Sequence, residues 1–433
     1  MPADPPAIVD RIGVLRPLRH RDFRLMWTGL AVSMVGDGMY LIAVALLVLQ
    51  DLDRSNGVLA LVQGSVLLPQ VVLIMGAGVL ADRVDRRQLL IVADVIRLVA
   101  IGVMAILTIA DLITVPILIG LALVYGAGQA LFGPAFSSIV PTIVPGEILV
   151  EANSLGHFVR PVAMMLVGPL IGGVVVDVAS TGAALIVDAL TFGFSAIMIL
   201  AMRTSAVVRD PGDVASPVDD LREGFRYVRS QRWLLIGMTG ATVALLCTWG
   251  PWENLLPVVV ESDLGGGGVE LGLVYGFGGA GAVLAAIVMA QRGSLPRRPL
   301  TVLYLAWALA MFMTAGFGLV TSVWQAMGVS FVAEGSMTVL IVVWVTLVQR
   351  LVPSELLGRV FSLDWMISVA GAPVSFAIVG PLSEAIGHDT TLILAGVAGG
   401  LIVLGCLFLP GARTPETDGS IARLDAERSP VAT

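Results

Sequence analysis

The chain has 433 residues, of which 57% are hydrophobic and only 13% are charged. Soluble domains carry about 25% charged residues, so this composition excludes an ordinary soluble protein and indicates that lipid is the solvent. The net charge of −7 averages over two sides of a membrane and therefore says little about binding partners.

The apolar runs predict an all-α integral membrane protein. Residues 1–24 form a polar arm that carries five Arg and lacks the short apolar core of a cleavable signal peptide. The later runs are continuous rather than alternating, which argues against a membrane β-barrel. Runs of about 20 apolar residues can each span a bilayer as a helix. We expect twelve such helices, at 25–50, 58–80, 89–110, 113–137, 153–176, 181–202, 233–260, 269–291, 299–320, 323–348, 360–383 and 387–410.

The Arg residues between these helices orient the chain. They concentrate in the N-terminal arm, in the tail, and in the connections that follow the second, sixth, eighth and tenth helices. Arg54 stands alone on the opposite side. Because cytoplasmic loops carry an excess of positive charge, both termini are expected in the cytoplasm. The expected location is the inner membrane of a bacterial cell, which the chain crosses many times.

The longest polar interruption divides the chain into two halves. Within 203–232, the segment "RDPGDVASPVDD" reads as a flexible linker and "LREGFRYVRSQRW" as a basic amphipathic helix on the cytoplasmic membrane surface. The expected domains are an N-terminal bundle at 25–202, a C-terminal bundle at 233–410 and a disordered cytoplasmic tail at 411–433.

The two halves also resemble each other. The segment "VPGEILVEANSL" at 144–155 is echoed by "VPSELLGRVFSL" at 352–363. Two six-helix repeats predict a pseudo-symmetric secondary transporter with its substrate site between the bundles.

The charged segment "GVLADRVDRR" at 78–87 resembles the loop signature of the major facilitator superfamily between the second and third helices. The segments "LFGPAFSSIVPTIVPGEILVEANSL" and "GPLIGGVVVD" resemble the branch that includes enterobactin exporters and macrolide efflux proteins. The resemblance covers about 20–410 and implies a gate in which Asp82 meets the start of the eleventh helix. The alternative is a loop that only sets topology. The expected gate residues are Gly78, Asp82, Arg83, Arg86, Arg87, Asp94, Arg97 and Asp364.

Charged residues at bilayer depth need a reason, because each costs at least ~2.5–3.5 kcal/mol to insert. Asp37 and Arg160 lie at similar depth and are expected to pair, either as a gate or proton-coupling element or as a static salt bridge. Glu334 has no basic residue in its predicted span, so it is either the carrier of a coupling proton or a neutral acid bonded to a neighbouring helix. Asp188 is expected to be structural.

A possible substrate contact lies at "TWGPWENLLP". Trp249, Trp252, Glu253 and Asn254 suit an amphipathic or cationic ligand in a helix broken by Pro. The same aromatic residues also suit a belt at the outer membrane interface.

The segment "VGPLIGG" at 167–173 resembles the core of the antiporter signature in the fifth helix. Gly168 and Pro169 are expected to break regular hydrogen bonding, and Gly172 to allow close packing against the other half. The fourth helix lacks the Arg of many drug–proton antiporters, since Leu112 to Val144 carries no charge. This absence weakens the transfer of their proton mechanism.

The function expected from these features is export of a hydrophobic or amphipathic small molecule, such as a drug, siderophore or natural product, by proton antiport with alternating access. The alternatives are a metabolite importer or facilitator, and a non-pumping lipid scramblase or receptor on the same fold. No nucleophile–base pair, metal-ligand spacing or Walker sequence occurs in the sequence. The segment "GFGGAG" at 276–281 matches GxGxxG, but it lies inside an apolar run with no preceding strand and is expected to serve helix packing. We therefore expect no enzyme activity, metal, cofactor or nucleic-acid partner, and a monomer driven by the proton gradient across the lipid bilayer.

Overall fold

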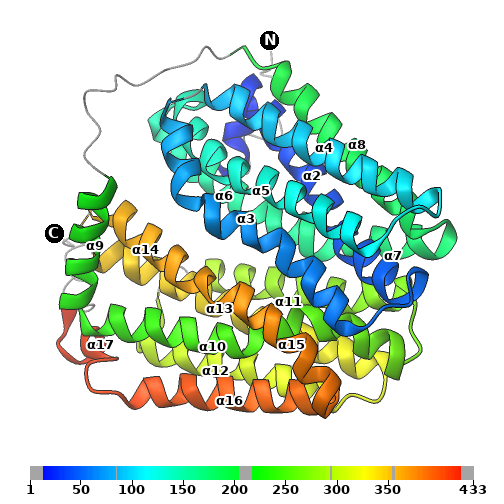
Figure 1. The fold of residues 1–433 in the computed structure, drawn as a ribbon. Helices are drawn as coiled ribbons and strands as arrows, with labels where there is room; N and C mark the ends of the chain where they lie inside the picture. Colours follow the sequence, from blue (N-terminus) through cyan, green and yellow to red (C-terminus); the bar gives the residue numbers. More distant parts are fainter. Residues whose placement is uncertain (1–12, 84, 204–216, 293–294, 354–355, 421–433) are drawn as a thin grey trace, which may run out of the picture. The chain divides into compact units, whose positions relative to one another are not determined.

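The described part of the chain is helical throughout. The computed structural model describes residues 13–83, 85–203, 217–292, 295–353 and 356–420 (Figure 1). Among these residues there is no strand, and twelve helices are long and apolar enough to cross a membrane. The predicted all-α class and the number of spans are therefore confirmed.

The helices group into two units of contact. Unit 1 consists of Met1–Pro211 with Val260–Gly276, and unit 2 consists of Gly212–Val259 with Phe277–Thr433. The segment Val260–Gly276, which we expected in the C-terminal bundle, thus groups with unit 1.

Unit 1 contains seven α-helices and the start of an eighth, joined by shorter 3-10 and π-helical segments. In chain order its elements are η1 Gly13–Arg19, α2 Arg21–Leu46, η2 Leu47–Asp51, α3 Asn56–Arg83, α4 Arg86–Ile109, α5 Val115–Ile143, η3 Gly146–Ile148, α6 Leu149–Val159, η4 Arg160–Val167, α7 Gly168–Val178 and α8 Thr181–Leu200, followed by most of η6 Val259–Asp263 and the start of α11 Gly268–Arg292.

Unit 2 begins with the helix of the central connection. It contains α9 Pro217–Ser230, α10 Arg232–Val258, the rest of α11, α12 Pro299–Phe317, α13 Val323–Leu351, α14 Leu357–Ala370, α15 Ala372–Ile386, α16 His388–Phe408 and the short α17 Thr414–Thr417.

The same pattern of helix packing occurs twice. The helix α8 packs against α2 and α4, and α16 packs in the same way against α10 and α12. Likewise α5 packs on α4 as α13 packs on α12, and α7 packs on α2 as α15 packs on α10. This correspondence is the one expected of two six-helix repeats in a transporter.

Short polar side chains fix where several helices begin. Asp85 caps α4, where its Oδ1 accepts a hydrogen bond from the backbone N–H of Arg87 at 2.9 Å. Ser180 and Ser322 cap α8 and α13 in the same way. Each cap satisfies a backbone N–H that the helix itself leaves without a partner. Asp85 in the charged loop therefore has a structural role beyond topology.

Two spans are broken at corresponding places. The fifth span consists of α6, the π-helical segment η4 and α7, and α7 begins at Gly168 and Pro169. The eleventh consists of α14 and α15, which meet at Gly371 and Pro373. Pro cannot donate a backbone hydrogen bond, so it suits the start of a new helix. The irregular π-helical stretch ends where α7 begins, and the break predicted at Gly168 and Pro169 stays a prediction. Discontinuous helices in matching positions are typical of transporters.

A glycine contact joins α2 to α7. A Cβ atom on Gly38 would lie 2.8 Å from Pro169 Cδ and 2.9 Å from Gly168 Cα, closer than real Cβ atoms approach their neighbours. We expect Gly38→Ala to lower the free energy of unfolding by about 1–3 kcal/mol, the usual cost of overpacking, and to lower the Tm in detergent. Gly120→Ala is the control, because nothing lies within 4 Å of a Cβ atom there. Equal Tm values for the two variants would show that α2 and α7 separate at no cost.

Candidate functional site

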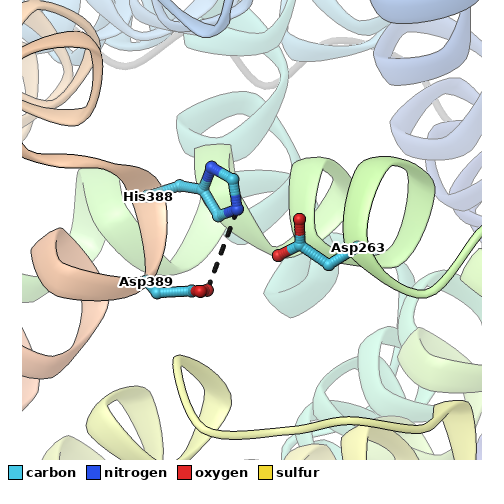
Figure 2. Close-up of side chains that lie close together, drawn as sticks. All are labelled: Asp263, His388 and Asp389. Atoms are coloured by element: carbon cyan, nitrogen blue, oxygen red, sulfur yellow. Dashed lines mark ion pairs between the residues drawn. The ribbon is translucent and has the colours of Figure 1, made fainter.

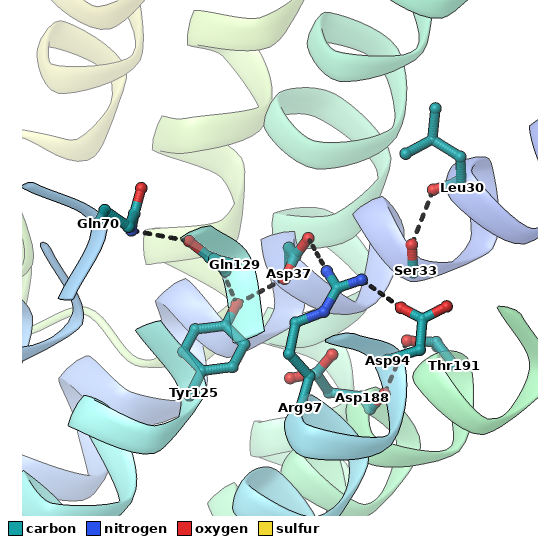
Figure 3. Close-up of polar contacts among 10 residues, drawn as sticks. All are labelled: Leu30, Ser33, Asp37, Gln70, Asp94, Arg97, Tyr125, Gln129, Asp188 and Thr191. Carbon is teal, nitrogen blue, oxygen red and sulfur yellow. Dashed lines mark hydrogen bonds and ion pairs between the residues drawn. The ribbon is translucent and has the colours of Figure 1, made fainter. Parts of the chain in front are cut away.

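A buried arginine in unit 1 holds two carboxyl groups (Figure 3). Arg97 on α4 is 3% exposed, and its Nη2 donates to Oδ1 of Asp94 one turn earlier. Its Nη1 lies 4.0 Å from Oδ2 of Asp37 on α2. The Arg97 Cζ also lies 4.4 Å from the ring centroids of Phe132 on α5 and Phe192 on α8. Cation–π contacts strengthen when the cation is removed from water, so four helices together fix the guanidinium.

The carboxylate of Asp37 is also the end of a chain of polar groups. Tyr125 Oη donates to Asp37 Oδ1 at 2.5 Å, and Gln129 Nε2 donates to Tyr125 Oη at 2.6 Å. Gln70 Nε2 on α3 in turn donates to Gln129 Oε1 at 3.0 Å. The chain runs through α5 and holds the Asp37 carboxylate in one orientation beside Arg97 (Figure 3).

A third carboxyl group belongs to the same cluster. Asp188 on α8 is 0% exposed, and neither of its carboxylate oxygens has a hydrogen-bond partner among the described residues. The hydroxyl of Thr191 donates to the backbone carbonyl of Asp188 at 2.7 Å and also lies beside its carboxyl group. Asp188 interacts electrostatically with Asp37 and Arg97. It is thus a buried acid without the phenol that holds Asp37 or the guanidinium contact that holds Asp94.

The acidic cluster (Asp37, Asp94 and Asp188 around Arg97) places three buried carboxyl groups around one guanidinium. At 1.5 Å per residue, Arg97 lies about 16 Å from the start of α4, well inside a hydrocarbon layer about 30 Å thick. One guanidinium balances one carboxylate, and a further charge at this depth costs at least ~2.5–3.5 kcal/mol. The remaining carboxyl groups are therefore stable only if they bind protons or gain another cation.

The predicted ion pair between Asp37 and Arg160 is not formed. The side chain of Arg160 is exposed at the start of η4, and it acts on Asp37 electrostatically less strongly than Arg97 does. The reason is helix packing: α2 and α4 both pack against α8, which brings Arg97 to Asp37. A role of Arg160 in gating or coupling stays a prediction.

Asp94 and Arg97, two of the predicted gate residues, are buried within unit 1, and their role in a gate stays a prediction. They stand in the first half of their span, which suggested a position near the membrane surface. In the structure Asp94 is 0% exposed and Arg97 points between α2, α5 and α8. Both belong to the acidic cluster.

Arg87, another predicted gate residue, is tied to its own bundle. Its Nε donates to the Ile199 carbonyl at 3.0 Å and its Nη2 to the Leu200 carbonyl at 2.6 Å. These carbonyls end α8, where a cation is favourable because the helix dipole is negative there. A further role of Arg87, or of Arg86, in a gate stays a prediction.

The side chains of three other gate residues are outside what the structure describes. Gly78, Asp82 and Arg83 lie in α3, but their side chains are not among the described ones. Ser354, which precedes the eleventh span, is outside the described residues altogether. The contact of Asp82 with the eleventh span therefore stays a prediction.

Asp364 is held inside unit 2. Its Oδ2 accepts a hydrogen bond from Trp344 Nε1 at 2.9 Å, and Trp344 packs edge-on against Trp233 with ring centroids 5.8 Å apart. This neutral donor gives Asp364 a structural role between α13 and α14, and its role in a gate stays a prediction.

The predicted substrate residues all lie on α10. Trp252 packs edge-on against Phe317 at the end of α12, with centroids 5.7 Å apart, and Asn254 is 0% exposed. Trp249 and Glu253 are half-buried. Contact with a substrate stays a prediction for all four predicted residues.

Glu334 is half-buried on α13. A Cβ atom on Gly278 would lie 3.1 Å from its Cγ, so α11 passes close beside it. Its role as the proton carrier stays a prediction.

Gly172 packs within its own bundle. A Cβ atom there would lie 2.8 Å from the Cα of Met39 on α2. The expectation that Gly172 packs against the other half is therefore wrong, because α7 turns this face toward α2.

Two ionisable side chains meet at the start of α16 (Figure 2). His388 Nε2 lies 3.8 Å from Oδ1 of the adjacent Asp389. An acid in the first turn of a helix is favourable with the helix dipole. We assign this pair a role at the helix start.

Two uncharged side chains beside the acidic cluster, Tyr125 and Gln129, were not predicted as site residues. Tyr125 and Gln129 are four residues apart and therefore share one face of α5. A polar pair at this spacing in a span without charge is the signal that points to a buried polar network. Asp188 was predicted to be structural, and the structure places it beside Asp37 and Arg97.

Comparisons with known proteins agree with the fold. A family model described as transmembrane secretion effector matches residues 12–431. Macrolide efflux protein A of Streptococcus pyogenes is 23% identical over 390 residues, which cover 86% of this chain and 92% of the relative. The multidrug efflux pump Tap of Mycobacterium tuberculosis is 27% identical over 382 residues, which cover 84% of this chain and 88% of the relative. Among solved structures, the nucleoside transporter NupG has a TM-score of 0.64 and 12% identity, covering 90% of this chain and 98% of its own; this likeness concerns the fold alone.

Proposed function

We propose that this chain, which belongs to the transmembrane secretion effector family of major facilitator transporters, exports a hydrophobic or amphipathic small molecule by proton antiport. The observation that carries the proposal is the acidic cluster, in which three buried carboxyl groups share one guanidinium. The names of the macrolide and multidrug efflux relatives support a drug-like substrate.

The cluster supplies a means of coupling. Asp188 binds the proton, because Asp37 and Asp94 are already held by Tyr125 and Arg97. When Asp188 releases its proton, the cluster gains a negative charge at bilayer depth, which is costly while the site is closed to water. Deprotonation therefore favours a state in which water or a substrate reaches the cluster. Alternation between the closed state and this open state would then depend on whether Asp188 is protonated.

Glu334 is the second candidate for the coupling proton. It lies on α13, whose packing on α12 corresponds to that of α5 on α4 in unit 1. A proton site in each bundle is compatible with antiport, so variants of Glu334 and Asp188 must be compared directly.

The proposal has further parts that follow from the Arg distribution and the fold. The protein works in the inner membrane of a bacterial cell as a monomer with both termini in the cytoplasm, and the proton gradient drives it without a cofactor. Single cysteines introduced at positions 213 and 266 should be labelled from opposite sides of the membrane. Labelling of both from the same side would overturn the orientation.

A flux experiment tests the export itself. The purified full-length chain is reconstituted in liposomes with an imposed pH gradient, and uptake of a radiolabelled macrolide and of a lipophilic cationic dye is followed. We expect accumulation against the concentration gradient that a protonophore abolishes, because proton release is the only energy source offered.

The alternatives give different results in the same vesicles. A facilitator would only equilibrate the probe, whatever the pH gradient. A scramblase would move fluorescent lipids between leaflets without any gradient. Uphill transport that persists after the gradient has collapsed would contradict proton antiport.

A further inference from the structure

The helix of the central connection is fixed to unit 2 by one of its faces. Gly224 of α9 is buried against α14, since a Cβ atom there would lie 3.0 Å from both Arg359 Cβ and Leu363 Cδ1. Glu223 forms an ion pair with Arg359. Tyr227 Oη donates to the carbonyl of Leu351 at 3.4 Å, and burial raises the pKa of this phenol, which keeps the donor protonated. The helix therefore has a defined rotation against α14 (Figure 1).

A second face of α9 is basic and aromatic. Arg222, Arg226 and Arg229 follow one another at intervals of four and three residues, so they form one stripe along the helix. All three are exposed, and Phe225 beside them is 51% exposed. Arg226 and Arg229 make no ion pair with any residue that the structure describes. Glu223, the acid nearest to the stripe in sequence, is instead engaged by Arg359.

This face borders an open pocket of about 450 Å³ within unit 2. Its rim is formed by the three arginines and Phe225, and α14 contributes Leu363 and Met366 to the lining. The pocket thus combines three positive charges with an apolar wall.

The pocket lies where the membrane surface meets the hydrocarbon. Only Gln231 separates the end of α9 from α10, which begins a membrane span at Arg232. Leu363 and Met366 lie within the span Leu357–Ile386. The arginines are therefore at headgroup level, whereas the apolar wall belongs to a helix that enters the bilayer.

We propose that this pocket between α9 and α14 binds an anionic phospholipid, with the phosphate on Arg226 and Arg229 and an acyl chain along Phe225, Leu363 and Met366. Arginine suits the phosphate because its planar guanidinium offers paired donors to phosphate oxygens. The apolar wall at membrane depth favours a lipid over a free anion, which would gain nothing from it. The proposal is independent of the transported substrate.

The test measures binding of phosphatidylglycerol to the full-length chain in detergent by native mass spectrometry. A juxtamembrane Arg contributes roughly a factor of five to binding of anionic lipid, so Arg226→Gln with Arg229→Gln should weaken binding by about 25-fold. The matched control is Arg297→Gln with Arg298→Gln. These two exposed arginines precede α12, outside the pocket, and give the same change in net charge. We expect the control to bind phosphatidylglycerol as the unmodified chain does, and phosphatidylcholine to bind weakly to all three.

Two further arms distinguish a lipid site from a phosphate site and from a general attraction between opposite charges. Phe225→Ser should weaken phosphatidylglycerol binding while the arginines are intact, because it removes apolar contact from the wall. Inorganic phosphate added in excess should not displace the lipid. Equal loss in the two double variants would mean that only overall charge matters, and displacement by phosphate would mean a phosphate site. No loss in the Arg226/Arg229 variant would also overturn the proposal.

Discussion

Arg97→Met should abolish transport and lower the stability of unit 1 more than any other single substitution in the acidic cluster. The guanidinium holds Asp94 and Asp37 and lies over Phe132 and Phe192. Removing one partner of a buried ion pair costs about 3–5 kcal/mol, because the other charge remains buried without compensation. Here two carboxyl groups lose their counter-charge at once. The measurement is the Tm of the purified protein together with its flux in liposomes.

The matched control is Arg160→Met, which makes the same replacement at an exposed position and should keep the Tm. Arg97→Lys should give an intermediate result, since an ammonium keeps the charge but is more strongly hydrated and lacks the planar fork. If the loss is electrostatic, Asp94→Asn added to Arg97→Met should recover part of the Tm, a coupling that a double-mutant cycle measures. An Arg97→Met variant that melts and transports like the unmodified chain would show that the cluster has no need of its cation.

The spans could be predicted because the bilayer imposes a length and an apolar composition on each helix. For the same reason Asp37 was recognisable as a residue that needs a partner. An irregular stretch of the fifth span near Gly168 and Pro169 was also readable, since Pro lacks the backbone donor of a regular helix. These features are local, and each can be read along one segment of chain.

The partner of Asp37 could not be predicted in this way. Position within a span gives depth, but it does not give the rotation of a helix about its axis. Arg97 lies on the face of α4 that packs on α8, and α8 also packs on α2, so three helices determine the ion pair. The predicted contact of Gly172 was wrong for the same reason, because the helix that Gly172 contacts depends on the rotation of α7. Where several acids and bases lie at similar depth, pairing by depth alone selects the wrong residue.

Asp188→Asn should abolish proton-driven export while leaving exchange down a gradient intact. Asn has nearly the shape of the protonated acid and cannot release a proton, so it fixes the cluster in one charge state. Asp188 is fully buried, and both of its oxygens lack a donor among the described residues, so a neutral amide is tolerated at the site. We expect uphill accumulation of the probe to fall at least tenfold, about 1.4 kcal/mol of lost driving force. Folding, measured by Tm, should be unchanged or improved, because a buried acid has been removed.

The comparison with Glu334→Gln locates the coupling proton. Both substitutions replace a membrane acid by its neutral amide, one in each unit, so a general effect of lost charge would appear in both. If Asp188 carries the proton, Asp188→Asn loses the pH dependence of export and Glu334→Gln keeps it. Asp37→Asn should differ from both, since it takes the hydrogen-bond acceptor from Tyr125 and a counter-charge from Arg97, and so impairs uphill and downhill flux together. In the opposite result, Asp188→Asn would keep the pH dependence of export and Glu334→Gln would lose it. That result would place the coupling site on α13 rather than in the acidic cluster. The direct measurement is proton release into a weakly buffered vesicle lumen on addition of the probe, which should vanish only in the variant that lacks the carrier.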